Sequence, residues 1–309
     1  FIPHLFFYFS LSYIYTLLFF YYLCLQFLTI YFFHVMLCVC EVFLVSKKRK
    51  RVKDLDAVHK IMPYLMANRC EAEVYYVEEI DVTNLLKYIK KINVGLEKHE
   101  RTTLFHAIIT GVAKTIYNRP LLNRYISGKR FYDRKDISLS FVAKNKLEDH
   151  SEERLIILEA KNKMTLKDIS QKILKVVSKT RQDNSNDMND FLGVVTSAPR
   201  WLLSFIMWLF RKLDFYGLVP SFVSDGDPNY TTVLLSNLGS VKANCCYHHL
   251  NNYGTNSIVI TVGVIHDKEV NGELRKYVNL GLTLDERIAD GIEEHNKLQL
   301  CCRNHNLIS

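Results

Sequence analysis

The chain changes composition abruptly after residue 46, and this change limits where a folded domain can lie. Residues 1–46 contain one charged side chain, Glu41, and are crowded with Phe, Tyr, Leu and Ile. Residues 47–53, KKRKRVK, then place six cations in seven positions. A membrane-spanning helix needs about 20 apolar residues, so segment 1–46 is long enough for one long pass or two short ones. We therefore expect the folded domain to begin after the basic run, at residue 54.

Two interpretations of segment 1–46 stay open. A transmembrane anchor would place the basic run and the domain on the cytoplasmic side, because cytoplasmic flanks carry an excess of Lys and Arg. A mispredicted start is the alternative, because the first methionine is Met36 and this composition is what T-rich untranslated DNA gives when it is translated. A signal peptide is not indicated, since no basic residues precede the apolar run. The predicted location is cytoplasmic, with membrane attachment under the first interpretation.

Charge and cysteine usage exclude several classes of protein. Most of the net charge of +8 lies in the basic run, and the rest of the chain is close to balance. A nucleic-acid partner is therefore not expected. The eight cysteines include adjacent pairs and one CxC, and these spacings match neither a zinc site nor a disulfide framework. We expect a reducing compartment and no metal.

The pattern from residue 54 onward is typical of an α/β domain. Period-two alternation and β-type residues predict strands, whereas apolar residues at helical spacing predict helices. Asp81 and Thr165 stand where each can cap a following helix. Strands are expected at 71–82, 130–132, 136–143, 154–160, 230–239, 257–265 and 275–284, and helices at 82–92, 102–118 and 165–181. The tail at 295–309 is irregular, and a broken or truncated end is one interpretation of it.

Residues 200–213, RWLLSFIMWLFRKL, are apolar all round for about a dozen positions. This length is too short for a comfortable membrane span. We therefore predict a helix that is buried in the core or lines a hydrophobic channel.

Three segments in fixed order carry a family resemblance. They are RPLLNRYISGKRFYDRKDISLSFVA at 119–143, LLSNLGSV at 234–241 and DERIADG at 285–291. In order and spacing they resemble the catalytic domain of the dihydrolipoyl acyltransferases of 2-oxo-acid dehydrogenase complexes and its relative chloramphenicol acetyltransferase. The resemblance covers about residues 53–294, and no GxGxxG, Walker A, GxSxG or HExxH motif competes with it.

The resemblance implies both a fold and an activity. It implies a two-layer α/β domain at 54–294, with a mixed β-sheet and flanking helices, that assembles as a homotrimer with active sites between subunits. It implies coenzyme A, as acyl-CoA, for the donor and a small molecule with a thiol, hydroxyl or amine for the acceptor. The chain shows no lipoyl domain, which favours a free-standing acyltransferase over the core of a large complex.

The same resemblance implies three site residues. Ser236 matches the hydroxyl that stabilises the oxyanion, a role in which a fixed donor needs little reorganisation. Asp290 matches the aspartate that orients the active-site loop. Glu286 stands where the family has its catalytic histidine. From the residues alone, Ser236 is better interpreted as an ordinary hydroxyl at a strand end, and Asp290 is equally a helix N-terminal acid.

A glutamate at position 286 changes the chemistry. Glutamate titrates near pH 4.3 and a thiol near 8.5, so proton transfer between them is uphill by roughly 5–6 kcal/mol. Burial of Glu286 would reduce this difference, whereas pairing with Arg287 would increase it. His248 and His249 in the loop 247–254 offer a substitute base, with His249 the candidate, although paired histidines in a polar loop are usually solvated. Two hypotheses follow, an active acyltransferase and an inactive trimeric binding or scaffold protein of the same fold.

Overall fold

The computed structural model describes residues 50–144, 153–161, 164–182 and 196–288, together with Gln26 and Gly193. The chain divides into two compact units, 1–48 and 49–309, and all of the helices and strands below belong to the second unit. Segment 1–46 apart from Gln26, residue Asp290 and the tail 295–309 lie outside the described residues.

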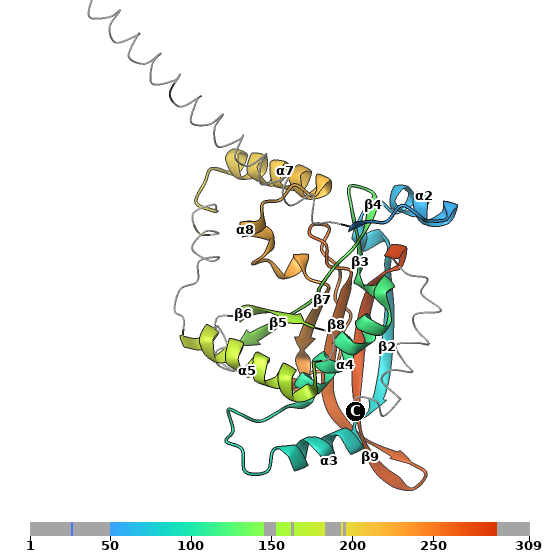
Figure 1. Cartoon of the computed structure of the whole chain (residues 1–309), viewed down its shortest axis with the longest axis vertical. Coiled ribbons are helices and arrows are strands. Elements are labelled where there is room, and N and C mark those ends of the chain that lie inside the picture. Colours follow the sequence, from blue (N-terminus) through green and yellow to red (C-terminus); the bar gives the residue numbers. More distant parts are fainter. Residues whose placement is uncertain are drawn as a thin grey trace, which may run out of the picture. The chain divides into compact units, whose positions relative to one another are not determined.

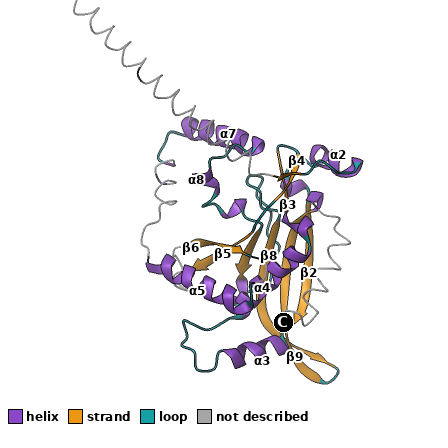
Figure 2. Cartoon of the chain, in the orientation of Figure 1, coloured by secondary structure: helices purple, strands orange, loops and turns teal. Residues whose placement is uncertain are grey.

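A six-stranded mixed sheet forms the centre of the second unit (Figures 1 and 2). The strand order is β2-β9-β8-β7-β5-β6, in which β5–β7 and β7–β8 are parallel and the other pairs are antiparallel. The strands are β2 (Glu73–Asp81), β5 (Ile137–Lys144), β6 (Glu153–Ala160), β7 (Val233–Asn237), β8 (Ile258–Val270) and β9 (Glu273–Asp285). The predicted mixed α/β fold is therefore confirmed, and each of the predicted strands corresponds to an observed one.

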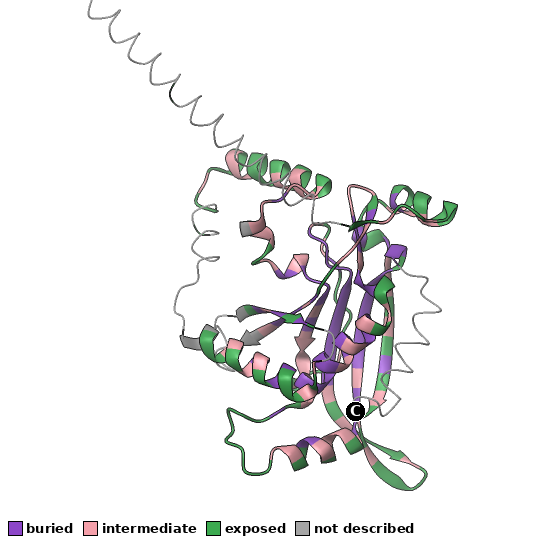
Figure 3. Cartoon of the chain, viewed as in Figure 1, coloured by how far each residue is buried: buried purple, intermediate pink, exposed green. Residues whose placement is uncertain are grey.

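Helices α4 (Leu104–Asn118) and α5 (Leu166–Gln182) pack against one face of the sheet, and α3 (Thr83–Ile92) follows β2. Helices α4 and α5 begin at polar caps, whereas the N-cap position of α3 is Val82, which makes no side-chain cap, and Asp81 lies just before it. Thr103 and Thr165 accept hydrogen bonds from the backbone N–H three residues later, and Asp81 accepts one from the N–H of Thr83. These caps explain why α4 and α5 start where they do. The main core lies between α4, α5 and the inward residues of the strands (Figure 3).

The face on which each strand residue lies follows from alternation along the central strands. Val233 and Leu235 of β7 belong to the core, as do Ile260 and Val262 of β8. Residues that alternate with them, such as Ser236 directly after Leu235, therefore point to the opposite face. This second face of the sheet carries the candidate chemistry on β7.

A smaller sheet, β1-β4-β3, lies beside the main sheet. It consists of β1 (Lys50–Arg51), β3 (Arg124–Ser127) and β4 (Arg130–Asp133), and α2 (Ala57–Leu65) follows β1. The β3–β4 turn uses positive φ at Gly128 (56°) and Lys129 (59°). Ile126, Phe131 and Ile288 form a second small core beneath it.

The prediction of a buried helix at 200–213 is wrong. These residues form most of α7 (Arg200–Tyr216), and none of its residues is buried. Trp201 is 72% exposed, and Phe205 and Trp208 are each 55% exposed. Hydropathy alone does not distinguish an apolar helix inside a core from one on its surface. Short elements α8 (Ser221–Ser224) and η3 (Pro228–Tyr230) connect α7 to β7. Within the described residues, no helix has both the length and the apolar character needed to cross a membrane.

Candidate active site

Ser236 lies near the end of β7, on the second face of the sheet. It pairs with Thr261 of β8, which in turn pairs with Gly281 of β9. The side chain is half-buried. Nothing among the described residues hydrogen-bonds to its hydroxyl, so this group is available to donate to a ligand. This placement fits the role that the sequence implied for Ser236.

The segment 243–250 crosses the same face, and its backbone lies in direct contact with β8 and β9. The Thr261 hydroxyl donates to the carbonyl of Cys246 at 2.5 Å and accepts from its N–H at 3.2 Å. A Cβ on Gly281 would lie 2.5 Å from that carbonyl, and a Cβ on Gly263 2.7 Å from the N of Cys245. Glycine is therefore required on two neighbouring strands so that the segment can lie flat beside Ser236.

Glu286 begins the short helix η5 (Glu286–Ile288), directly after β9. Its N–H donates to the carbonyl of Ala72 at 2.8 Å, which fixes the backbone, while its side chain is exposed. Burial raises the pKa of Tyr76, and the Glu286 carboxylate adds to this shift. Tyr76 packs against the main core. The Glu286 carboxylate therefore lies within electrostatic reach of the helix-covered side of the sheet.

A buried ion pair holds the backbone on both sides of Glu286. The Arg287 guanidinium donates to both carboxylate oxygens of Asp285, at 2.8 and 2.7 Å, and to the carbonyl of Met66 at 2.7 Å. Both residues are at most 2% exposed. Arg287 is thus paired with Asp285 and not with Glu286. The Arg287–Glu286 pairing that the sequence left open is absent from the described structure.

Within one protomer Ser236 and Glu286 are far apart. Across the sheet, Ser236 is level with Gly281 of β9. Asp285, the residue before Glu286, lies four residues further along β9, about 14 Å at the usual rise per strand residue. Two strand spacings between β7 and β9 add about 10 Å across the sheet. A base and an oxyanion donor must both reach one reacting group within about 3 Å. A single protomer therefore does not bring this pair together.

The candidate substitute base, His249, lies on the surface. His248 and His249 are exposed and their rings stack with centroids 4.9 Å apart. His248 Nδ1 lies 2.8 Å from the carbonyl of His249. Neither ring contacts a carboxylate in the described structure, which leaves both as solvated loop histidines in one protomer. Asp290 lies beyond the last described residue, so its proposed support of the loop stays a prediction.

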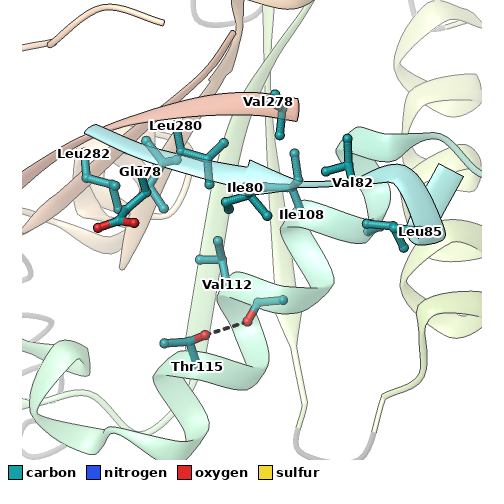
Figure 4. A pocket seen from close by; sticks show the side chains of 13 residues that line it. Glu78, Ile80, Val82, Leu85, Ile108, Val112, Thr115, Val278, Leu280 and Leu282 are labelled. Carbon is teal, nitrogen blue, oxygen red and sulfur yellow. Dashed lines mark hydrogen bonds between the residues drawn. The ribbon is translucent and has the colours of Figure 1, made fainter. Parts of the chain in front are cut away.

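A second polar group, which sequence reasoning missed, lies in an apolar cavity between α4 and the β2–β9 side of the sheet (Figure 4). The cavity holds about 620 Å³, counted out to its open mouth. Glu78, 8% exposed, is the one acidic residue of its lining and lies next to Leu282. Alternation of Tyr76, Glu78 and Ile80 on β2 could have identified this inward carboxylate. The cavity lies on the helix side of the sheet, and Ser236 faces the other side.

Sequence reasoning also missed the polar cluster that fastens α7 to the domain. Asp214 accepts hydrogen bonds from the Tyr230 hydroxyl at 2.7 Å and from the N–H of Gly254 at 3.0 Å. Burial raises the pKa of Asp214 and raises that of Tyr253 to about 12. The available signal was Asp214 itself, an acid that follows a long apolar run, because such a residue marks the face of the helix that contacts the rest of the domain.

A family comparison supports the resemblance that the motifs predicted. Residues 48–197 match the sequence model described as 2-oxoacid dehydrogenases acyltransferase (catalytic domain). This interval contains segment 119–143 and ends before Ser236 and Glu286. No curated protein sequence matches the chain.

Solved structures of acyltransferases share the fold. A probable dihydrolipoamide acetyltransferase from Listeria monocytogenes 4b F2365 matches with a TM-score of 0.53 and 17% identity, covering 83% of this chain and 97% of that chain. Chloramphenicol acetyltransferase matches with a TM-score of 0.54 and 12% identity, covering 84% and 100%. The dihydrolipoamide acetyltransferase of Azotobacter vinelandii gives 0.52 and 14%, covering 83% and 93%. The expected chloramphenicol acetyltransferase-like architecture is confirmed.

Proposed function

We propose that this chain, with the fold of chloramphenicol acetyltransferase and a partial match to an acyltransferase catalytic domain, is a coenzyme-A-dependent acyltransferase. Acyl-CoA is the donor substrate, and the acceptor is a small molecule with a thiol, hydroxyl or amine. The domain would work on the cytoplasmic side of a membrane or free in the cytoplasm.

The observation that carries this proposal is that the fold exposes both Ser236 and Glu286 to ligands but holds them far apart within one protomer. Ser236 offers a half-buried hydroxyl, and Glu286 is held by fixed backbone beside a buried ion pair. Neither side chain belongs to the hydrophobic core of its own protomer. If protomers associate as a ring, Glu286 of one can face Ser236 of the next, and exclusion of water there would supply the burial that one protomer lacks.

The proposed reaction proceeds by direct transfer. Glu286 accepts the proton of the acceptor group as that group attacks the thioester carbonyl. The Ser236 hydroxyl donates a hydrogen bond to the resulting oxyanion. The intermediate then breaks its carbon–sulfur bond, and the coenzyme A thiolate leaves and takes the proton from Glu286. Asp290 is proposed to support the loop.

The Azotobacter vinelandii dihydrolipoamide acetyltransferase provides a comparison for these roles. A serine, a histidine and an asparagine of that enzyme have been investigated for their part in its catalytic mechanism. In the proposed assignment Ser236 corresponds to that serine. Two acids, Glu286 and Asp290, stand in place of the histidine and the asparagine.

One observation favours the second candidate function, a catalytically inactive trimeric scaffold. Glu286 is exposed in the described structure, where a carboxylate is a weak base for a thiol. Under this alternative the fold keeps its channel for a ligand and has lost the chemistry.

Release of free coenzyme A thiol from acetyl-CoA, with several acceptors, separates the two functions. An active enzyme should lose about 10²–10³-fold in kcat with Ser236→Ala and a large part of its turnover with Glu286→Gln. Glu286→His should retain or increase turnover. Glu269→Gln, an exposed glutamate on the β8–β9 hairpin, is the matched control and should leave the rate unchanged. Coenzyme A binding with no turnover in the wild type would support the scaffold.

Mixed oligomers test the shared site directly. Ser236→Ala and Glu286→Gln subunits, co-expressed in equal amounts, would restore about a quarter of the wild-type sites if each site takes one residue from each of two subunits. Two inactive parents that give an inactive mixture would contradict the shared site.

A further inference from the structure

The outward surface of α7 is far more apolar than a free protein surface normally is. Trp201, Phe205 and Trp208 are 72%, 55% and 55% exposed, and their neighbours Ile206, Met207 and Leu209 are exposed as well. Monomeric soluble proteins rarely expose a large continuous apolar patch, and those that do use it to bind a partner or a membrane. The opposite side of α7 is fastened to the domain through Asp214 and through Phe210, whose ring lies 5.7 Å from that of Tyr253.

A second exposed apolar helix lies beside the same turn. In α2, residues Val58, Ile61, Tyr64 and Leu65 are all more than half exposed. The β3–β4 turn contacts both helices. A Cβ on Gly128 would lie 3.0 Å from the carbonyl of Phe215 in α7, and the Lys129 ammonium lies 4.5 Å from the centre of the Tyr64 ring in α2. Figure 1 shows α2 and α7 at the same end of the domain.

Cations surround these two helices. Arg211 and Lys212 are exposed on α7, and Lys50 and Arg51 are exposed on β1, which pairs with β4. Two acids, Asp54 and Asp56, lie between β1 and the body of α2, and they leave the area with an excess of positive charge. Anionic lipid headgroups attract such basic groups next to an apolar surface.

We propose that this face, formed by α7, α2 and the β3–β4 turn, docks on the surface of an anionic lipid bilayer, with α7 lying in the interface. At 17 residues α7 is about 26 Å long, shorter than the hydrocarbon core, and Arg211, Lys212 and Asp214 interrupt it, so it does not span. Trp and Phe beside Lys and Arg are typical of helices that lie in the interface.

A bilayer fits this face better than a second copy of the chain does. In a two-fold contact the same patch faces itself, so the cations of one copy would meet those of the other. An anionic surface instead complements them. The basic run at residues 47–53 leads into β1, whose Lys50 and Arg51 belong to this same face. The proposal is independent of acyl transfer, because it involves neither Ser236 nor Glu286.

Tryptophan fluorescence of the full chain tests the proposal, because the chain has two tryptophans and both are on α7. The protein is mixed with vesicles of phosphatidylcholine and phosphatidylserine whose acyl chains are brominated near the headgroup. Docking predicts a blue shift, quenching by the brominated lipid and protection from aqueous iodide, all weaker with phosphatidylcholine alone. The readout follows α7 even if segment 1–46 by itself carries the chain to the vesicles.

Matched variants sharpen the test. Phe205→Gln with Leu209→Gln keeps both tryptophans and should lower the docked population of α7 about tenfold or more. Arg211→Ala and Lys212→Ala should each lower it about fivefold on anionic vesicles. The control, Val94→Gln with Leu274→Gln, changes two side chains that are 79% and 70% exposed elsewhere and should leave quenching unchanged.

Two outcomes would overturn the proposal. One is a chain that floats with the vesicles while its tryptophan emission stays that of exposed side chains. The other is protection from iodide without vesicles that rises with protein concentration, which would assign the face to a second copy.

Discussion

Acidification should destabilise the domain through one histidine of α4. His106 is 6% exposed, and its Nδ1 lies 2.9 Å from the hydroxyl of Ser170 on α5, which lies 3.0 Å from the hydroxyl of Thr102. Burial lowers the pKa of His106 from 6.5 to about 4. The neutral ring fits this hydroxyl pair, whereas a protonated ring would bring a charge into the core between α4 and α5.

The sign of the effect follows from linkage. Between pH 6.5 and 4 the unfolded chain binds a proton at His106 and the folded chain does not, so folding stability is complete above pH 6.5 and is lost as the pH falls. A shift of this size corresponds to about 3 kcal/mol of unfolding free energy. This is a large part of the 5–15 kcal/mol that a domain usually has.

Urea denaturation at a series of pH values, at constant protein concentration, measures the loss. The wild type should lose about 3 kcal/mol more than His106→Asn between pH 6.5 and 4. His99→Asn, at an exposed position in the loop after α3, is the control and should follow the wild type. Parallel curves for the wild type and His106→Asn would refute the reasoning.

Three further changes test the packing around the candidate site and the helix caps. Asp285→Ala should cost about 3–5 kcal/mol of unfolding free energy by urea denaturation, because Arg287 would stay buried without its partner. Asp285→Leu with Arg287→Met should recover most of that loss, and a double variant as weak as the single one would contradict this. Gly281→Ala should lower the melting temperature by an amount equivalent to about 1–3 kcal/mol, since its Cβ would meet the Cys246 carbonyl at 2.5 Å; an unchanged melting temperature would contradict the close approach. Thr165→Ala should remove the cap of α5 and cost about 1 kcal/mol in the same denaturation assay, whereas Thr165→Ser should cost little.

Local signals predicted most of the fold. The alternation at 71–82 and 136–143 gave strands, and the predicted cap at Thr165 sets the start of α5, because each depends on residues close in sequence. At α3 the N-cap is Val82, and the predicted cap residue Asp81, one position earlier in the chain, instead accepts from the N–H of Thr83. The helix at 200–213 was found as a helix, but its burial was predicted wrongly. Whether an apolar helix is covered depends on what packs over it, and a single sequence does not contain that information.

The candidate site shows the same limit. The motifs identified Ser236 and Glu286, but strand register decides that they lie on rungs far apart within one protomer. Register comes from pairings between β7, β8 and β9, which no local pattern encodes. The buried Asp285–Arg287 pair was also missed, although both residues stand in the motif, because the only pairing considered for Arg287 was with its neighbour Glu286.

The pairing of β2 with β9 has a consequence for how the protein is made. Glu73 at the start of β2 pairs with Asp285 at the end of β9, so the edge of the sheet joins residues about 200 positions apart. Such long-range pairing forms slowly and only once both strands are present. A ribosome makes β2 about 200 residues before the end of β9, which leaves β2 without its partner while the residues between them are synthesised. The six-stranded sheet can therefore close only after β9 has been synthesised, and until then the backbone edge that β2 offers to β9 stays unpaired.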